Sequence, residues 1–243
     1  MRIAILSDVH SNLEALQATL EYCRQARIHQ YICLGDVVGY GADPNPCCDL
    51  IREVAAVTLL GNHDAAVVGV MDTDYYYEAA RDVLYWTRET LSAENFRWLY
   101  SLPYTFRHEN LAFFHSAPIM PSGFYYVVST SDAEKHLRVF NRLHEYNFVG
   151  HSHLTNRYLL STNTVKDAGK MDIRRYEDWK WIINVGSVGQ PRDRDSRACF
   201  GIFDTGNQTF QHIRVPYDIE KTATKIRSSG LDEKFARRLF AGV

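Results

Sequence analysis

Short polar fragments follow several apolar runs of this chain, and this repeated arrangement constrains the fold more than any other feature. The apolar run Tyr31–Leu34 ends in Gly35-Asp36, where a loop hinged on glycine carries one carboxylate. Strands in α/β folds open at their carboxyl ends into a shared crevice, so we expect such fragments to meet at one edge of a sheet. The other fragments of this kind are Asp8-Val-His10, Gly61-Asn-His-Asp64, His115 and Gly150-His-Ser-His153.

The first quarter of the chain alternates predicted strands with predicted helices. The expected strands are Arg2–Ser7, Tyr31–Leu34 and Ala56–Leu60. Asn12 or Ser11 can cap the first helix, whose apolar residues recur at helical spacing. Asn45 is expected to cap a second helix that carries Pro46 in its first turn. This order favours a parallel sheet with right-handed crossovers, and hence an α/β fold.

Later segments are expected to add strands of both directions. Leu111–Phe114 and Phe148–Val149 are short apolar strands that end in histidine fragments. From Arg157 onward, alternating runs separated by turns predict antiparallel strands at 157–161, 179–185, 199–204 and 209–216. The polar segment 163–177 is expected to form a long hairpin, and the tail 218–243 two short helices.

An aromatic helical insert is predicted at about 72–102. Tyrosine, tryptophan and phenylalanine lie there among helix formers, and Ser92 is expected to separate two helices as an N-cap. The insert is interpreted as core packing, as a lid or wall of a substrate site, or as an oligomer surface, here a candidate homodimer surface.

Composition bounds the class of protein. The chain has 243 residues, 46% of them hydrophobic and 23% charged, and we treat 1–243 as one globular domain. The formal net charge of −2 gives no signal for nucleic acid or membrane surfaces. The N-terminus reads as a strand, with no signal peptide, and no apolar run reaches the roughly 18 residues of a membrane span. We therefore expect a cytoplasmic protein.

The polar fragments together offer two aspartates, four histidines and one asparagine as metal ligands. Nitrogen and oxygen donors without thiolate suit Mn²⁺, Fe, Zn²⁺, Co²⁺ or Ni²⁺. Two such ions close together would acidify a shared water and clamp a phosphoryl oxygen, and would allow direct in-line displacement. Each fragment alone is a weak signal; the ordered set, each member following an apolar strand, is specific.

The ordered set resembles the calcineurin-like metallophosphoesterase superfamily, from the first strand to about residue 153. The later segment Asn184–Asp193 is similar to its small bacterial branch, the YfcE-like phosphodiesterases. The resemblance implies an α-β-β-α sandwich of four layers with two mixed sheets. It also implies a hydrolase that acts on a phosphomonoester or phosphodiester through a hydroxide bridging two divalent metal ions, with Mn²⁺ as our first choice.

The resemblance assigns roles residue by residue. Asp8, His10 and His153 would hold one metal ion, and Asn62, His115 and His151 the other. Asp36 would bridge the two ions. His63 would contact the substrate together with Asn62, either as the general acid for the leaving oxygen or as a stabiliser of transition-state charge. Asp64 either orients His63 or faces solvent.

The sequence has two rival interpretations. A scaffold of the same fold without catalysis would tolerate the loss of His63, which this chain retains. An all-helical phosphohydrolase built on His63-Asp64 conflicts with the predicted strands. The sequence leaves open whether the small phosphate-ester substrate is a nucleotide, a sugar phosphate or another phosphate ester.

Three further features were assigned mainly to structure. Gly186–Gly189 is interpreted as a turn near the site, although its amides are of a kind that can bind phosphate. The arginines at 192, 194 and 197 alternate with Asp193 and Asp195, which favours a solvated loop that pairs with itself over a second phosphate site. Tyr125 and Tyr126 are candidates for the wall of a cleft.

Overall fold

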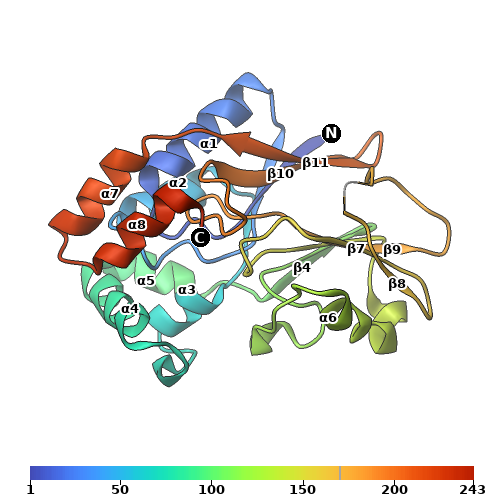
Figure 1. The fold of residues 1–243 in the computed structure, drawn as a ribbon, viewed down its shortest axis with the longest axis horizontal. Helices are drawn as coiled ribbons and strands as arrows, with labels where there is room; N and C mark the ends of the chain where they lie inside the picture. The colour runs from blue at the N-terminus through green and yellow to red at the C-terminus, as the bar shows by residue number, and fades with distance from the viewer. Residues whose placement is uncertain (170) are drawn as a thin grey trace.

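Two mixed β-sheets stacked face to face form the centre of the molecule (Figure 1). The computed structural model describes residues 1–169 and 171–243. In the described residues the first sheet has the strand order β11 (Thr209–Val215), β10 (Ala198–Asp204), β1 (Arg2–Leu6), β2 (Gln30–Cys33) and β3 (Val57–Thr58). The second has the order β4 (Thr105–His108), β5 (Leu111–Phe114), β6 (Tyr146–Val149), β9 (Lys180–Asn184), β7 (Arg157–Leu160) and β8 (Val165–Asp167).

Helices cover the outer face of each sheet and the end where the strands open. The α-helices of the described residues are α1 (Leu13–Gln25), α2 (Pro44–Val54), α3 (Asn62–Val67), α4 (Glu78–Thr90), α5 (Ala93–Tyr100), α6 (Thr130–Glu134), α7 (Ile219–Ser228) and α8 (Glu233–Ala241). Short 3₁₀ helices are η1 (Thr73–Tyr75), η2 (Pro121–Gly123) and η3 (Leu137–Arg142). In the described part of the chain, no helix has both the length and the apolar character needed to cross a membrane.

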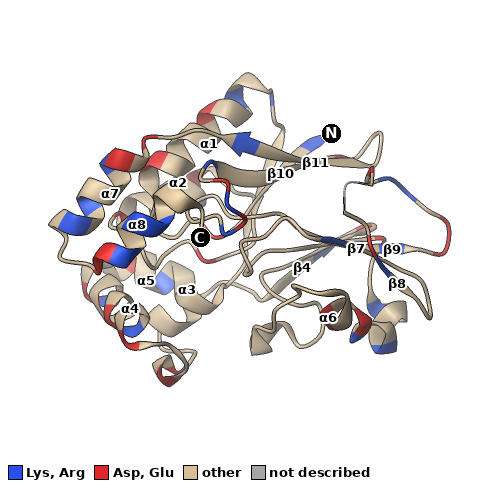
Figure 2. Ribbon diagram, in the orientation of Figure 1, with Lys and Arg blue, Asp and Glu red and all other residues tan. Residues whose placement is uncertain are grey.

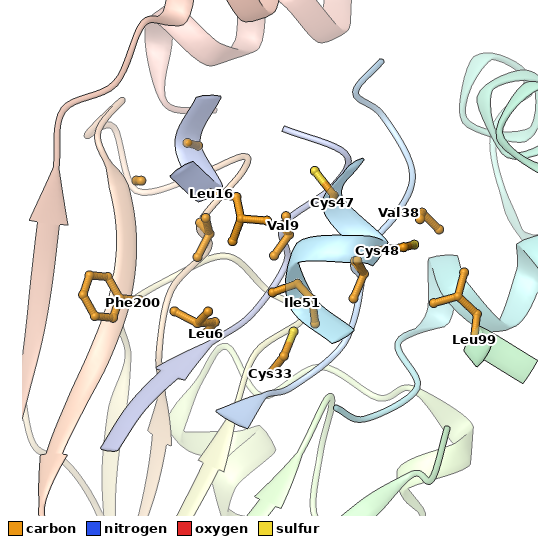
Figure 3. Close-up of a cluster of buried hydrophobic side chains, with 14 of the residues drawn as sticks. Leu6, Val9, Leu16, Cys33, Val38, Cys47, Cys48, Ile51, Leu99 and Phe200 are labelled. Carbon is orange, nitrogen blue, oxygen red and sulfur yellow. The ribbon is translucent and has the colours of Figure 1, made fainter. Parts of the chain in front are cut away.

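Alternation along the strands divides the core into layers. Ile3 and Ile5 of β1 pack between the two sheets, whereas Ala4 and Leu6 face the helices on the outer side. Figure 3 shows this outer cluster, in which Leu6 lies with residues of α1 and α2. A third cluster fills the space between the second sheet and α6. The predicted α-β-β-α sandwich of four layers is therefore confirmed.

The strand directions follow the prediction in the first sheet and refine it in the second. β1, β2 and β3 are parallel, with Ile5 opposite Ile32 and Cys33 opposite Thr58. β9 is antiparallel to β7 as expected, but it is also parallel to β6, where Phe148 pairs with Ile183. The segment 163–177 supplies β8, and its residue Lys170 lies outside the described residues.

Two predicted helix caps have different outcomes. The Asn12 side chain accepts a hydrogen bond from the Ala15 amide and caps α1 as predicted. The predicted cap Asn45 is wrong, because α2 begins at Pro44 and Asn45 lies in its first turn. There the Asn45 side chain accepts from the Ser92 amide, and so ties α2 to the junction between α4 and α5. Ser92 caps α5 as predicted, by accepting from the Asn95 amide.

The five cysteines are buried and free, at positions 23, 33, 47, 48 and 199. Burial raises the pKa of the Cys23 thiol to about 12, and that of the Cys47 and Cys48 thiols well above the usual value. These side chains therefore act as small apolar packing groups.

Replacing Phe148 tests the contact between the two sheets. Phe148 of β6 is fully buried and packs against Phe203 and Phe210 of the first sheet, with ring centroids 5.5 and 5.6 Å away. We expect Phe148→Ala to lower the free energy of unfolding by about 3–5 kcal/mol, because the cavity forms where the sheets meet. The control Phe240→Ala removes a ring that is 48% exposed, and should change stability by less than about 0.5 kcal/mol in urea titrations.

Candidate metal centre

The loops that follow β1 and β2 run side by side and carry two of the predicted ligands. The Asp8 amide donates to the Gly35 carbonyl at 3.0 Å, and the His10 amide donates to the Asp36 carbonyl at 2.9 Å. The hydrogen-bonded pairing of the two strands therefore continues past their ends. It holds Asp8, His10 and Asp36 at one edge of the first sheet, as the sequence predicted.

The backbone at these residues is left-handed, which sequence spacing did not indicate. Asp8, His10 and Asp36 have φ of 54°, 49° and 52°, and His151 and His153 have φ of 66° and 59°. Residues other than glycine rarely adopt this conformation, which costs of order 1 kcal/mol each. Side chains two positions apart thus converge on one point because the backbone coils, and not because an extended strand continues.

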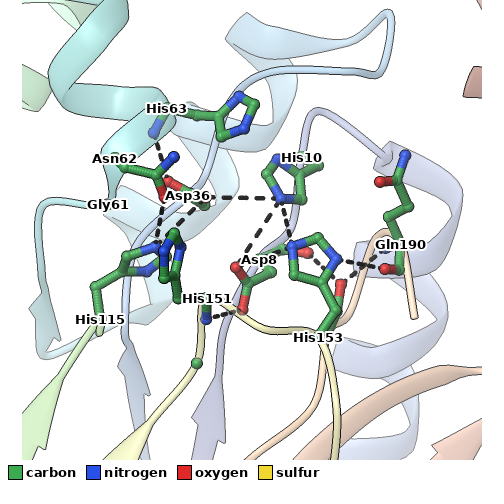
Figure 4. Close-up of polar contacts among 12 residues, drawn as sticks. Asp8, His10, Asp36, Gly61, Asn62, His63, His115, His151, His153 and Gln190 are labelled. Atoms are coloured by element: carbon green, nitrogen blue, oxygen red, sulfur yellow. Dashed lines mark hydrogen bonds and ion pairs between the residues drawn. The ribbon is translucent and has the colours of Figure 1, made fainter. Parts of the chain in front are cut away.

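All seven predicted ligands meet at this edge and are buried (Figure 4). Three groups of side chains bring possible ligand atoms within 4.8 Å of one another: Asp8 with His10 and His153; Asp36 with His115 and His151; and His10 with Asp36 and His63. Asn62 joins the second group, since its Oδ1 lies 3.0 Å from His115 Nε2.

A backbone carbonyl accepts a hydrogen bond from one ring nitrogen of each of the four predicted histidine ligands. Nδ1 of His10, His115 and His153 donates to the carbonyls of Val38, Leu34 and Gln190, and Nε2 of His151 donates to that of Phe124. This contact orients each ring, and in the neutral form of the ring it leaves the other nitrogen as a lone pair directed into the site, which is the arrangement of metal-binding histidines.

The inner atoms of the first group are acceptors that face one another. Nε2 of His10 and Nε2 of His153 lie 3.1 Å apart, and both are acceptors in the tautomers just assigned. Asp8 Oδ1 lies 3.3 Å from His153 Nε2 and is buried without a hydrogen-bond partner among the described residues. Three acceptors that face one another without a donor repel each other, and a bound metal ion removes that repulsion. The residues therefore fit a metal site.

The Asp36 carboxylate lies between the two groups. Its Oδ2 is 3.7 Å from His10 Nε2 on one side and 3.4 Å from His115 Nε2 on the other. Its Oδ1 accepts from the His63 amide at 2.8 Å. Gly61 is close enough that a Cβ there would lie 2.1 Å from Asp36 Oδ1. A side chain at position 61 would thus displace the carboxylate.

Burial and charge set the protonation of the site. Burial opposes ionisation of Asp8 and Asp36, but neighbouring histidines outweigh it and hold both pKa values below the usual range. Burial lowers the pKa of His151 to about 3. Burial also disfavours the charged form of His115, but the Asp36 carboxylate outweighs it and raises the His115 pKa to about 9. The site thus favours added positive charge.

His63 differs from the four histidines that are predicted metal ligands. No backbone carbonyl holds its ring, and its Nδ1 is buried against Gly39 without a hydrogen-bond partner among the described residues. Its ring packs between Tyr40 and Tyr76, with centroid distances of 4.4 and 5.2 Å. Burial lowers the His63 pKa to about 4, so the ring is neutral near pH 7.

Asp64 takes neither of the two places considered for it. It is fully buried, and its two carboxylate oxygens accept the amides of Val38 and Gly61, each at 3.1 Å. Burial, together with the charge on Asp36, raises its pKa to about 7. Asp64 therefore ties the loop that carries Asp36 to Gly61, the residue before α3, and does not orient His63.

The turn Gly186–Gly189 supports the site as a structural element. The amides of Val188 and Gly189 donate to the carbonyls of Ser7 and Asp8, each at 2.9 Å, so they are not free to bind phosphate. This agrees with the interpretation as a turn.

A cavity of about 770 Å³ opens next to the metal ligands. Asn62, His63 and His151 line it, as do Tyr125 and Tyr126, which the sequence offered as cleft residues. The Tyr126 ring stacks on His151 at a centroid distance of 3.9 Å. Tyr76 and Tyr77, which precede α4, also line the cavity, so the aromatic insert contributes a wall as well as core packing.

The sequence did not predict that Tyr40 and Arg238 lie at the site, and it placed Arg192 in a solvated loop. All three line the cavity. Tyr40 follows the Asp36 loop directly, which was the one available signal. Arg238 lies on α8, about 175 residues beyond His63 in the chain, and no local pattern marks it.

Comparison with known proteins relates this chain to phosphoesterases. The family model for the calcineurin-like phosphoesterase superfamily domain matches residues 1–208. The uncharacterized protein MJ0912 of Methanocaldococcus jannaschii is 38% identical over 244 residues, which is 99% of this chain and 98% of that protein.

Two solved structures extend the likeness to the fold. A metallophosphoesterase from Sphaerobacter thermophilus is 35% identical, with a TM-score of 0.85 over 100% of this chain and 99% of that chain. The hypothetical protein PH1004 from Pyrococcus horikoshii OT3 has a TM-score of 0.81 over 100% and 98% at 20% identity, which shows the fold alone.

Proton release on metal binding tests the protonation of the site. At pH 7.5 the pKa of about 9 keeps His115 charged in the metal-free protein, and a metal ligand must be neutral. We expect Mn²⁺ binding to release about one proton from His115, and this release to decline as the pH rises past about 9. Calorimetry in buffers of different ionisation enthalpy measures it.

The exposed His108 supplies the control for this experiment. His108→Gln should release the same number of protons as the unaltered chain, whereas His115→Gln should lose the release that declines at high pH. Binding of Mn²⁺ without proton release at pH 7.5 would contradict the assignment of His115.

Proposed function

This chain belongs to the calcineurin-like phosphoesterase superfamily, and we propose that it hydrolyses a phosphomonoester or phosphodiester with two bound divalent metal ions. It is a phosphoesterase, by its family and by its likeness to a metallophosphoesterase of 35% identity over its whole length. The observation that carries the dinuclear part of the proposal is the position of Asp36 Oδ2 between His10 and His115.

We assign the ligands by the groups in which they gather. Asp8, His10 and His153 would hold one ion, and Asn62, His115 and His151 the other, with Asp36 shared by both. The backbone carbonyls behind the four histidines support this assignment, because they leave one free lone pair on each ring. Nitrogen and oxygen donors without sulfur favour Mn²⁺ as our first choice, with Fe, Zn²⁺, Co²⁺ and Ni²⁺ as alternatives.

The two ions, when bound, would lower the pKa of a water molecule and offset charge on the phosphoryl oxygens. The chain supplies the remaining groups. In hydrolysis the water oxygen bonds to phosphorus, the bond from phosphorus to the leaving oxygen breaks, and the leaving oxygen takes up a proton. Asn62 lines the cavity, where its amide nitrogen donates to the Tyr76 hydroxyl at 2.6 Å.

His63 is the group proposed to serve the leaving oxygen. His63 lines the cavity, and its backbone amide donates a hydrogen bond to Asp36. The proposed bridging carboxylate therefore helps to fix the position of His63. Packing between Tyr40 and Tyr76 restricts the ring further. From this place the neutral ring can donate a hydrogen bond to transition-state charge, and it would serve as the general acid only in its protonated form.

Paired variants separate the roles of His63 and Asp36. His63→Ala should retain the metal content and lower kcat by roughly 10²–10⁴-fold, because it removes only the group that serves the substrate. Asp36→Asn should lower the content of both metal ions, because the shared carboxylate becomes a neutral amide. Elemental analysis and hydrolysis of p-nitrophenyl phosphate and bis-p-nitrophenyl phosphate with Mn²⁺ measure both effects.

The control for this pair is His108→Ala, which changes an exposed histidine of β4 and should alter neither metal content nor turnover. Equal loss of metal in His63→Ala and Asp36→Asn would make His63 a ligand and overturn its proposed role. A metal-loaded protein that cleaves neither ester would favour the scaffold of the same fold.

A further inference from the structure

Arg192 is a cation of the cavity wall that lacks a carboxylate partner in the described part of the chain. Its guanidinium lies 5.8 Å from the centre of the Tyr40 ring and donates to the Gln190 side chain at 3.1 Å. Its neighbours Asp193 and Asp195 instead pair with Arg214 and Arg197. Both acidic neighbours are thus paired with other arginines, and the positive charge of Arg192 is not neutralised where it borders the cavity.

Arg238 is a second cation of this wall. It lies on α8, half-buried, and its Nη1 donates to the Tyr77 hydroxyl at 3.3 Å. The adjacent Arg237 lies 3.8 Å from the Glu233 carboxylate, whereas no ion pair to Arg238 occurs within 1–169 and 171–243. α7 and α8 carry both signs of charge along their length (Figure 2), and Glu233, the acidic residue of α8, pairs with Arg227 and Arg237 and not with Arg238.

The two arginines reach the cavity from different parts of the chain. α8 packs against the loop after Asp36, where the Phe235 and Tyr40 rings are 5.0 Å apart. Tyr40 in turn contacts His63, at 4.4 Å between ring centroids. Arg192 and His63 thus pack against one tyrosine, which places a positive charge one ring away from the group proposed to serve the leaving oxygen.

Much of the rest of the wall is aromatic, and three of its tyrosines are open to solvent. Tyr77, Tyr125 and Tyr126 line the cavity and are 47%, 55% and 51% exposed. Exposed aromatic rings grouped at a cavity are typical of a ligand site, because their faces can stack on a planar group. At about 770 Å³ the cavity is large enough for a planar ring system with two phosphoryl groups.

We propose that Arg192 and Arg238 form a second anion subsite, and that the substrate is an aromatic organic phosphate with a second phosphoryl group beside the scissile one. This inference rests on the proposed function, because the scissile phosphoryl group must lie at the metal ligands. A guanidinium donates in a planar fork that matches phosphate oxygens. The chemistry is that of a nucleoside diphosphate or one of its esters.

Equilibrium binding to the Mn²⁺-loaded protein tests the subsite without requiring turnover. The probes are α,β-methylene-ADP, AMP and methylenediphosphonate, measured by calorimetry. The first probe should bind at least about 10-fold more tightly than AMP, because only it presents a second phosphoryl group to the arginines. It should also bind at least about 10-fold more tightly than methylenediphosphonate, which lacks the aromatic group.

Variants identify the residues responsible. Arg192→Gln and Arg238→Gln should each reduce the preference for α,β-methylene-ADP over AMP by about 10-fold. The matched controls Arg194→Gln and Arg237→Gln change neighbouring arginines that do not line the cavity, and should retain the preference. Equal binding of α,β-methylene-ADP and AMP, or a preference that persists in both cavity variants, would overturn the subsite.

Hydrolysis of p-nitrophenyl phosphate and bis-p-nitrophenyl phosphate by the unaltered chain distinguishes failure of the anion subsite from failure of the proposed function. Hydrolysis of either ester without a preference for α,β-methylene-ADP would leave the proposed function in place and overturn this inference. A preference for α,β-methylene-ADP with hydrolysis of neither ester would support the anion subsite and contradict the proposed function.

Discussion

Mutual repulsion among buried acceptor atoms is the constraint on which the site depends. Nε2 of His10 faces Nε2 of His153 at 3.1 Å, beside a carboxylate oxygen of Asp8 that has no partner in the described residues. Such an arrangement is unfavourable by itself, and a bound cation offsets the cost of the unpaired polar atoms. The backbone carbonyls behind the histidines show that the surrounding fold is built to present these lone pairs inward.

The fold meets this constraint by holding strained backbone in place. Five of the predicted ligands have left-handed φ, and each such residue costs of order 1 kcal/mol. Hydrogen bonds from the Asp8 and His10 amides to the β2 loop oppose this cost, as does Asp64, which accepts one amide from the Asp36 loop and one from Gly61. The buried contact between the two sheets supplies the rigid support from which these loops extend.

Local sequence patterns sufficed to predict that the candidate ligands lie together, but they predicted only part of the cavity wall. Asp8, Asp36, His115 and the histidines at 151 and 153 could be predicted because each follows an apolar strand, and parallel strands end at one edge. The left-handed backbone could not, since it depends on pairing between two loops. The position of Arg238 at the cavity depends on the packing of α8 against Tyr40, and the unpaired charge of Arg192 depends on the ion pair between Arg214 and Asp193. Residue spacing in the sequence encodes neither.

The most direct test of a dinuclear centre bridged by Asp36 is anomalous X-ray scattering from crystals grown with Mn²⁺. We expect two peaks of anomalous density. One should lie among Asp8, His10 and His153, the other among Asn62, His115 and His151, with the Asp36 carboxylate in contact with both. A single peak, or a peak whose ligands include the His63 ring, would contradict the assignment of a dinuclear centre bridged by Asp36.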